Sequence, residues 1–264
     1  MTSPQQKKFF DTFGFLVLSQ TFSPQEARAI EDAYERIMTD AFGEPARRLD
    51  LTKQFVIDPG FCERSAFLRN LPEDPRILQT VQDLLGPGAF YTGSDGALRV
   101  GDTDWHPDQG WDPSIPEGRE DPNFQAQSGH YYPGIKVAIY IDVVGADTGC
   151  LRVIPCSIQS PFHEMLRSLH CDIPDRGASL LEDPNFEQLG LAPAQVPAYA
   201  IESGPGDVVF FSHQLWHAAI GGAKGRRMFA MSFKAEPSNE GQQNLANHKK
   251  NRSKGSREQT PVVA

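Results

Sequence analysis

The pattern of apolar and polar positions divides the chain into a shorter part with helical periodicity and a longer part with strand periodicity. Apolar residues recur every three or four positions over 4–12, from Ser23 to about Met38, and over 75–85. This spacing predicts three helices. Ser23-Pro24-Gln25-Glu26 is a capping-box pattern with proline at the first helical position. Between the first two helices, after Gly14, the apolar run 15–18 predicts a short buried strand.

From about residue 89 the chain changes to short apolar or alternating segments separated by Gly, Pro and Asp. The strands expected there are 89–92, 97–106, 135–144, 150–155, 196–202, 207–211 and 226–234. Many short strands with turns between them favour an antiparallel barrel or a jelly roll. We therefore expect a mainly β protein with flanking helices. It would be a single domain over 1–264, with a helical part (1–88), a barrel core (89–235) and a flexible tail (236–264).

Composition narrows the class of protein. The chain has 264 residues, of which 39% are hydrophobic, a net charge of -9 and a pI near 5.3. A negative balance argues against a nucleic acid or an anionic membrane as partner. No run approaches the length of a membrane-spanning helix, no secretory leader is recognisable, and the four cysteines form no Cys-x-x-Cys pair. We expect a soluble, cytoplasmic protein.

The segment 104–111, Asp-Trp-His-Pro-Asp-Gln-Gly-Trp, carries the first candidate chemistry. In an extended backbone, residues i and i+2 point to the same side, so His106 and Asp108 can reach one ion. They would supply two ligands of the 2-His-1-carboxylate arrangement that binds non-haem Fe(II). The competing interpretation is a turn residue beside a capping aspartate, because seven histidines make a chance His-x-Asp common.

A third ligand is expected near His213 and His217, which follow the apolar run 208–211. On a helix, His-x-x-x-His is a zinc signature. On a strand, residues four apart lie roughly 13 Å from each other and cannot share an ion. Since the local sequence favours a strand, only one histidine is a ligand. We choose His217, which is followed by small residues and a turn, and expect His213 to be an ordinary hydrogen-bonding histidine.

Arg226 and Arg227 open the last predicted strand. Because side chains alternate, one arginine should point into the barrel and the other to solvent. Arg226 shares a face with the small residues Ala230 and Ser232, so it is the better candidate to bind a carboxylate. Surface ion pairs for both arginines are the alternative, and which of the two binds a ligand stays open.

Aromatic residues on or beside the segment 105–134 are candidates for the wall of a substrate pocket, and simple packing competes with that role for each of them. Trp111 and Tyr132 are the preferred candidates; Trp105 and Tyr131 are the others. Lys136, at the start of a predicted strand, would either meet an acidic substrate or be a solvated strand end, and we favour the second.

Together these segments resemble the phytanoyl-CoA dioxygenase family of Fe(II)- and 2-oxoglutarate-dependent oxygenases. The opening helix, strand and Ser-Pro-Gln-Glu helix are similar to that family's N-terminus. The segment 149–157, Gly-Cys-Leu-Arg-Val-Ile-Pro-Cys-Ser, resembles its Gly-x-Leu-x-Val-x-Pro-x-Ser segment. The run from Gly206 to His217, followed by Arg226, matches its distal histidine and co-substrate arginine. The chain departs from the family at Pro107, often Gln, and at Ala219, often Ser.

The resemblance implies a double-stranded β-helix (jelly roll, cupin-like) core and a dioxygenase that uses Fe(II), 2-oxoglutarate and O2. Iron would be held by His106, Asp108 and His217, and the far carboxylate of 2-oxoglutarate by Arg226. A small-molecule metabolite would be oxidised, by default hydroxylated, with release of succinate and CO2. The sequence specifies neither the substrate nor the oligomeric state.

Two other classes of protein use the same scaffold. One is a cupin-like metal-binding protein or isomerase with these three ligands and no 2-oxoglutarate. The other is a scaffold without catalytic activity, which the complete His106, Asp108 and His217 set argues against.

Overall fold

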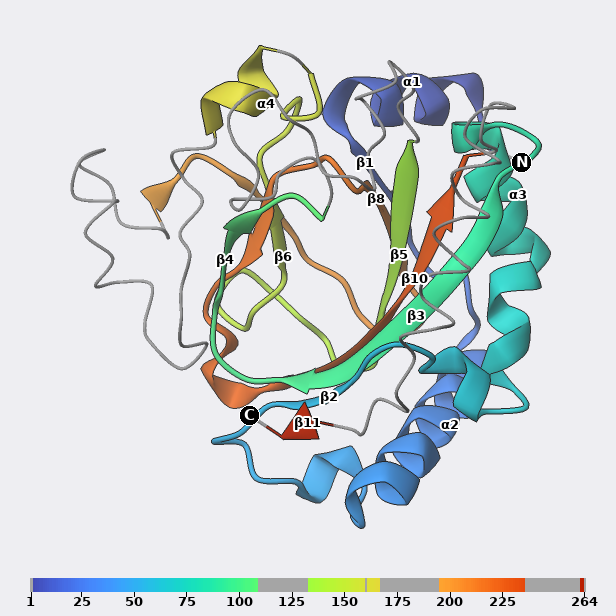
Figure 1. Ribbon diagram of the computed structural model, residues 1–264, viewed down its shortest axis with the longest axis vertical. Helices are drawn as coiled ribbons and strands as arrows, with labels where there is room; N and C mark the ends of the chain where they lie inside the picture. Colours follow the sequence, from blue (N-terminus) through green and yellow to red (C-terminus); the bar gives the residue numbers. More distant parts are fainter. Residues whose placement is uncertain (1, 109–132, 160, 167–194, 236–261, 264) are drawn as a thin grey trace, which may run out of the picture.

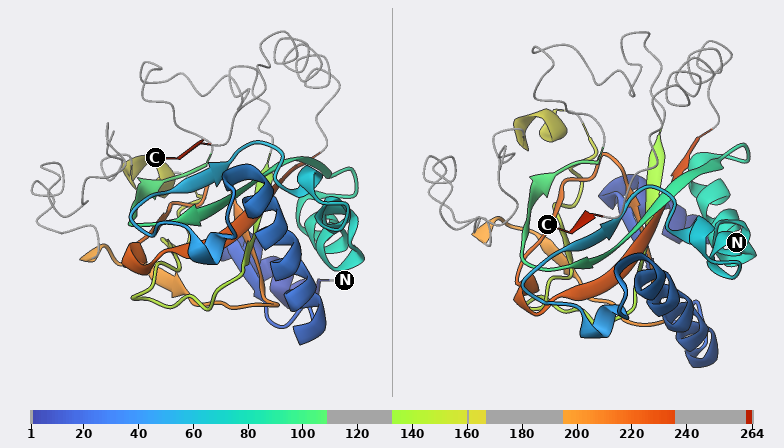
Figure 2. Two further views of the ribbon diagram at one scale, coloured as in Figure 1. Left: turned by 90° about the horizontal axis from the view of Figure 1, so that it is seen from below. Right: turned by 60° about the horizontal axis from the view of Figure 1, so that its bottom comes forward.

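Two antiparallel β-sheets face each other, and helices cover the outer face of the larger sheet (Figures 1 and 2). The computed structural model describes residues 2–108, 133–159, 161–166, 195–235 and 262–263. The predicted loop over 112–134 and the tail from 236 lie almost entirely outside these residues.

The helices form where capping residues and apolar periodicity predict them. The three main helices are α1 (Pro4–Phe13), α2 (Pro24–Phe42) and α3 (Pro75–Leu85). Ser3 and Ser23 make capping boxes in front of a proline, and Gly14 ends α1 with a φ of 85°. The α2 helix continues beyond the predicted end near Met38. The shorter helical turns are α4 (Phe162–Met165), η1 (Ala46–Arg48), η2 (Cys62–Arg64), η3 (Leu68–Glu73) and η8 (Gly222–Lys224).

The strand order is that of a jelly roll. The larger sheet runs β1 (Phe15–Leu18), β8 (Val208–Ser212), β5 (Gly134–Tyr140), β10 (Arg226–Lys234), β3 (Phe90–Arg99), β2 (Phe55–Ile57) and β11 (Val262–Val263). The smaller sheet runs β4 (Thr103–His106), β9 (His217–Ala219), β6 (Leu151–Val153) and β7 (Tyr199–Ile201). Neighbouring strands are mostly distant in sequence, and in the described residues the two sheets do not join into a closed barrel. The mainly β, jelly-roll prediction is confirmed.

Several strand boundaries differ from the sequence expectation. The predicted pair 89–92 and 97–106 is one long strand, β3, followed after Gly101 by β4 in the other sheet. The short strands β2 and β9 were not separated from their surroundings by the apolar pattern. Val262–Val263, in the segment predicted to be a flexible tail, pairs with β2. The division into one domain with three parts stays a prediction.

The larger sheet separates two apolar clusters. On its outer face, Phe229, Met231 and Phe233 of β10 pack with α2 and α3 in the largest buried cluster. On its inner face, Ala230 belongs to a second cluster, which also contains Leu151 and Val153 of the smaller sheet. Alternate residues of β10 therefore serve opposite faces, as strand geometry requires.

In the part of the chain that the structure describes, no helix is both long and apolar enough to cross a membrane. Cys62, Cys150 and Cys156 carry free thiols, the first two of them buried, and Cys171 lies outside the described residues.

The outer core leaves no room at Gly96, on the helix-facing side of β3. A Cβ atom there would overlap the ring of Phe61, which is fully buried and stacks on Phe229 with ring centroids 5.6 Å apart. We expect Gly96→Ala to lower the free energy of unfolding by about 1–3 kcal/mol, measured by urea denaturation, because the ring must move. Combining it with Phe61→Leu should cost less than the sum of the two single changes. Additive losses would contradict this packing.

Candidate metal centre

Two imidazoles meet at the junction of β4 and β9 in the smaller sheet. His106 and His217 are direct cross-strand partners, and their ring centroids lie 4.4 Å apart. Residues directly opposite each other on paired strands have their side chains on the same face of the sheet. Phe211 of the larger sheet contacts His217 edge-on, with ring centroids 4.9 Å apart. The two rings therefore occupy the space between the sheets.

Asp108 completes the group. It follows β4 by two residues, and one ligand atom from each of His106, Asp108 and His217 lies within 4.8 Å of the other two. The local His-x-Asp segment and the distant His217 are thus brought together, as the sequence suggested. That the three bind a metal stays a prediction.

Hydrogen bonds orient both rings for metal binding. His106 Nδ1 lies 2.8 Å from the Asp104 carbonyl, and His217 Nδ1 lies 2.7 Å from the Leu215 carbonyl. A carbonyl only accepts, so each Nδ1 carries the proton and each Nε2 keeps its lone pair for a ligand. Burial lowers the pKa of His217 to about 3, with the neighbouring charge of His106 acting in the same direction. The neutral form that metal binding requires is therefore favoured.

The two oxygens of Asp108 have different surroundings. Oδ1 accepts from Lys136 Nζ at 3.5 Å, whereas Oδ2 is buried and has no hydrogen-bond partner among the described residues. Burial raises the pKa of Asp108, but the positive charges of Lys136 and of the neighbouring histidines together outweigh this and hold the pKa below its usual value. A buried anionic oxygen without a partner, on a carboxylate grouped with two imidazoles, fits a divalent cation.

Lys136 is not the solvated strand end that we favoured from the sequence. Its side chain is only 22% exposed, and it also pairs with Asp95 of β3 at 3.4 Å. Asp95 was missed because residues 93–96, with two glycines, were interpreted as a break between strands. On an unbroken β3, Asp95 lies in the inward-facing set with Ala97 and Arg99.

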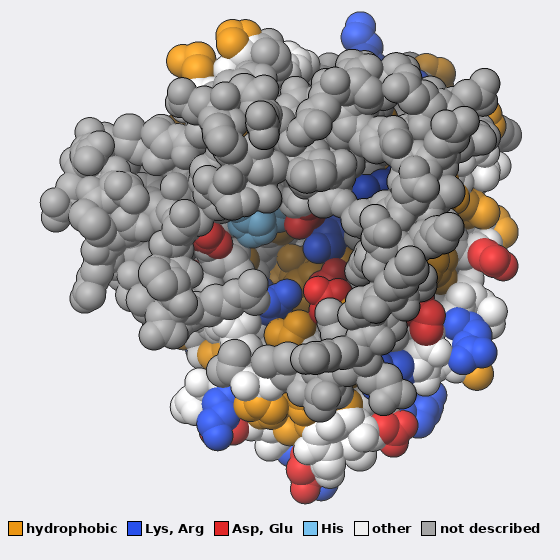
Figure 3. Space-filling view, in the orientation of Figure 1, with side chains coloured by type: hydrophobic (Ala, Val, Ile, Leu, Met, Phe, Trp, Pro, Cys, Tyr) orange, Lys and Arg blue, Asp and Glu red, His pale blue; other side chains and the backbone are white. Residues whose placement is uncertain are grey.

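The face shown in Figure 3 has a hollow in which histidine, acidic and basic side chains gather and hydrophobic ones lie deeper. In the matching ribbon view the hollow lies between β4 on one side and β3, β5 and β10 on the other (Figure 1).

Arg226 points inward from the start of β10 and is 2% exposed. Its guanidinium donates to the Gly101 carbonyl at 3.0 Å and lies against Gly149 and Gly222, where a Cβ atom would collide with it. Its Nε has no partner and no carboxylate pairs with it among the described residues. Burial lowers the pKa of Arg226, which marks an uncompensated charge. An anionic ligand bound to the guanidinium would offset the free-energy cost of burying this charge.

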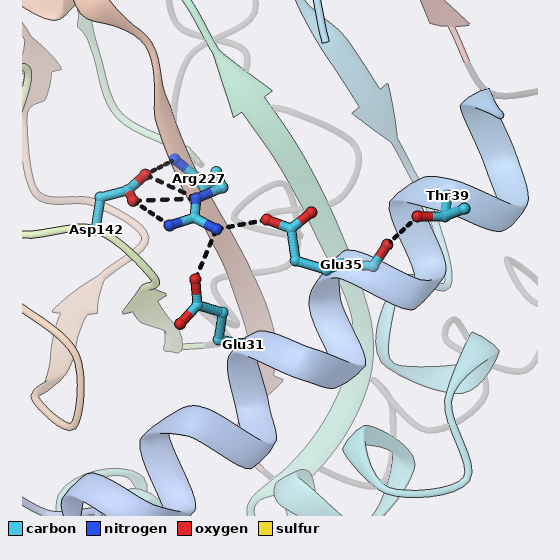
Figure 4. A network of polar contacts seen from close by, with 5 residues as sticks. All are labelled: Glu31, Glu35, Thr39, Asp142 and Arg227. Carbon is cyan, nitrogen blue, oxygen red and sulfur yellow. Dashed lines mark hydrogen bonds and ion pairs between the residues drawn. The ribbon is translucent and has the colours of Figure 1, made fainter. Parts of the chain in front are cut away.

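Arg227 points to the opposite face, but not into solvent as predicted. Its guanidinium binds Asp142 at 2.6 Å and Glu31 at 2.8 Å, and it also pairs with Glu35 of α2 (Figure 4). Burial lowers its pKa, but these carboxylates outweigh it and the pKa is raised. Arg227 therefore joins β10 to α2, and of the two arginines Arg226 is the one available to a ligand.

Other candidates lie elsewhere or outside the described residues. Trp105 is fully buried in a cluster with Trp216 and Ala218, on the other side of β4 from His106. It packs the smaller sheet and does not wall the hollow. His213 is buried just beyond β8 and is not in the metal-ligand group. Neither of its ring nitrogens has a hydrogen-bond partner among the described residues, so it is not the hydrogen-bonding histidine that we expected. The preferred aromatic candidates Trp111 and Tyr132, and Tyr131 with them, lie outside the described residues.

With this geometry in place, the comparisons identify the family. The family model for phytanoyl-CoA dioxygenase (PhyH) matches residues 10–228, so the chain belongs to that family. The family uses Fe(II), 2-oxoglutarate and O2, and the predicted enzyme class, a non-haem Fe(II)- and 2-oxoglutarate-dependent dioxygenase, is confirmed. A comparison of the chain with curated proteins gives no match.

Solved structures share the fold at low sequence identity. HygX from Streptomyces hygroscopicus, with nickel and 2-oxoglutarate bound, is 19% identical over 88% of this chain and 87% of its own, with a TM-score of 0.64. EvdO2 from Micromonospora carbonacea var. aurantiaca, complexed with 2-oxoglutarate, is 17% identical over 90% and 93%, with a TM-score of 0.57. The carbocyclase SnoK from nogalamycin biosynthesis is 18% identical over 88% and 84%, with a TM-score of 0.57.

The Arg227 cluster predicts a loss of stability separate from ligand binding. Arg227→Met leaves Glu35, with a side chain 10% exposed, without its cation. We expect a loss of about 2 kcal/mol and a melting temperature lower by roughly 4–8 °C in calorimetry. Glu35→Leu combined with Arg227→Met should recover part of the loss, because no buried charge then lacks a partner. A double variant less stable than Arg227→Met alone would contradict this.

We expect His213 to make the stability of the metal-free protein sensitive to acid. Burial lowers its pKa to about 4, whereas an unfolded chain titrates near 6.5. The unfolded chain therefore binds more protons between these values, and stability falls as the pH drops from about 6.5 towards 4. In chelator-treated protein unfolded by urea, His213→Gln should lose about 2 kcal/mol less than wild type between pH 6.5 and 4.5. Equal losses in the two proteins would exclude this role.

Proposed function

We propose that this protein is a dioxygenase whose ferrous iron is held by His106, Asp108 and His217, and that it oxidises, by default hydroxylates, a small-molecule metabolite. The observation that carries the proposal is the convergence of three ligand atoms within 4.8 Å, with Asp108 Oδ2 buried and otherwise without a partner. Hydroxylation would consume one O2 and one 2-oxoglutarate and release succinate and CO2.

Iron with 2-oxoglutarate and O2 supplies an oxidant strong enough for an unactivated C–H bond. The chain's own residues position the reactants. The carbonyls of Asp104 and Leu215 keep the ligand nitrogens of His106 and His217 unprotonated. Apolar side chains such as Phe211, Leu151 and Val153 keep water from the inner end of the space between the sheets.

Arg226 would bind the far carboxylate of 2-oxoglutarate. Its charge has no acidic partner among the described residues, and Gly149 and Gly222 leave the space that its guanidinium occupies, because a Cβ atom at either position would collide with it. Arg99 is its direct cross-strand partner on β3 and adds a second positive charge at this end of the inner face. Two cations at one site suit a dianionic co-substrate.

The proposal of a small molecule as substrate is supported by HygX, one of whose structures holds nickel, 2-oxoglutarate and hygromycin B. The metabolite itself and the oxidised carbon are left open. A cytoplasmic location and the absence of a nucleic-acid partner stay predictions from the sequence.

The test is succinate release from 2-oxoglutarate under Fe(II) and air, screened over a library of small metabolites. His217→Ala and Asp108→Ala should reduce turnover to background, because each removes one of three ligands. Metal-dependent turnover that does not require 2-oxoglutarate would favour the cupin-like isomerase instead.

Arg226→Met should raise the KM for 2-oxoglutarate at least roughly 30-fold, equivalent to about 2 kcal/mol for a lost buried charge pair. Arg227→Met is the matched control, since it removes the same charge from the adjacent residue on the opposite face. It should leave the KM unchanged at a temperature where it is folded. An unchanged KM in Arg226→Met would overturn the assignment of the co-substrate carboxylate.

A further inference from the structure

A chain of three charged side chains links β3 and β5 to the segment after β4 and ends on a proposed metal ligand. Asp95 of β3 pairs with Lys136 of β5 at 3.4 Å, and Lys136 reaches Asp108 Oδ1 at 3.5 Å. All three side chains are largely buried, with exposed fractions of 18%, 22% and 19%.

The fold brings Asp95 and Lys136 together across an intervening strand. In the ladder, Asp95 is opposite Ala230 of β10, and Lys136 is opposite Ser232 of the same strand. Both β10 residues are small and face inward. The Asp95–Lys136 ion pair therefore passes over β10 at two small side chains. Asp95 gives the Lys136 ammonium group a second carboxylate partner besides Asp108.

Lys136 makes the two oxygens of Asp108 unequal. Oδ1 is occupied by the ammonium group, and Oδ2 is the oxygen without a partner among the described residues. A free carboxylate can rotate and present either oxygen, or both, to a cation. Hydrogen bonds from neighbouring residues commonly fix the orientation of metal ligands.

We propose that Lys136, anchored by Asp95, is a positioning residue that holds Asp108 so that Oδ2 alone is presented to the metal. The inference rests on the proposed function, because it takes His106, Asp108 and His217 as the ligands. It assigns Lys136 a role in metal affinity and not in contact with substrate or 2-oxoglutarate.

Charge and positioning predict opposite effects for the loss of Lys136. Removing a cation beside a metal site reduces repulsion and should tighten binding of a divalent ion. Removing the group that orients Asp108 should weaken binding, by roughly 10- to 100-fold as for other residues that orient metal ligands. The sign of the change therefore separates the two roles.

The experiment measures Co(II) affinity of the full chain by competition with a chromophoric chelator, without 2-oxoglutarate or substrate. We expect Lys136→Met to weaken Co(II) binding roughly 10- to 100-fold. The double variant Asp95→Asn/Lys136→Met keeps the net charge of the pair at zero and should show a similar loss. Lys8→Met, which removes an exposed lysine of α1, is the control for loss of one positive charge. Circular dichroism checks that each variant is folded.

In succinate assays, Lys136→Met should regain much of its kcat at high Fe(II), with the KM for 2-oxoglutarate unchanged. Co(II) binding as tight as wild type, or tighter, in the folded variants would overturn the proposal while leaving the proposed function intact. The same holds if Co(II) affinity is unchanged and the KM for 2-oxoglutarate rises, since Lys136 would then bind the co-substrate. Absence of Co(II) binding in the wild type would overturn both.

Discussion

The pairing of charges inside the space between the two sheets is the constraint on which the site depends. The inner face of the larger sheet carries Asp95, Arg99, Lys136 and Arg226, where burial penalises any charge without a partner. The first and third neutralise each other. Arg226 has no carboxylate partner among the described residues, and Asp108 has one oxygen without a partner. The described residues alone leave a cation and an anion incompletely compensated, at the two places where a co-substrate and a metal would bind.

On the outer face of the same sheet, the buried positive charge is paired with carboxylates of the chain itself. Arg227, one residue from Arg226, is surrounded by Glu31, Glu35 and Asp142. Two adjacent arginines thus differ because strand geometry points one into the space between the sheets and the other towards α2. The first is available for binding, and the second holds the helical layer onto the sheet.

Much of this was predictable, because the decisive signals are local. The capping box at Ser23 predicted the start of α2, apolar periodicity predicted α1, and the alternation of side chains along β10 separated Arg226 from Arg227. The His-x-Asp segment supplied two of the three candidate ligands. Local signals failed where packing decides: Gly96 looks like a strand breaker, yet it lies inside β3 because the ring of Phe61 occupies the place of its side chain. Because the prediction divided β3 into two strands, Asp95 fell between them and was not considered as a partner for Lys136. Lys136 was then interpreted as a solvated strand end. Trp105 was kept as a candidate for the pocket wall beside the alternative of simple packing, although it alternates with His106 along β4; the structure has it packing on the other face.

The alternation of side chains along β10 also limits where the chain can gain or lose residues. Loss or gain of one residue in the turn around Gly222–Lys224, ahead of β10, would exchange the two faces if the ladder with β3 and β5 kept its spacing. Phe229 and Met231 would then fill the space between the sheets, and the guanidinium of Arg226 would face α2. Length variation in that connection is therefore incompatible with both the proposed chemistry and the helical layer. The β3–β4 connection at Gly101 has a similar constraint, because it sets which of Trp105 and His106 faces the space between the sheets.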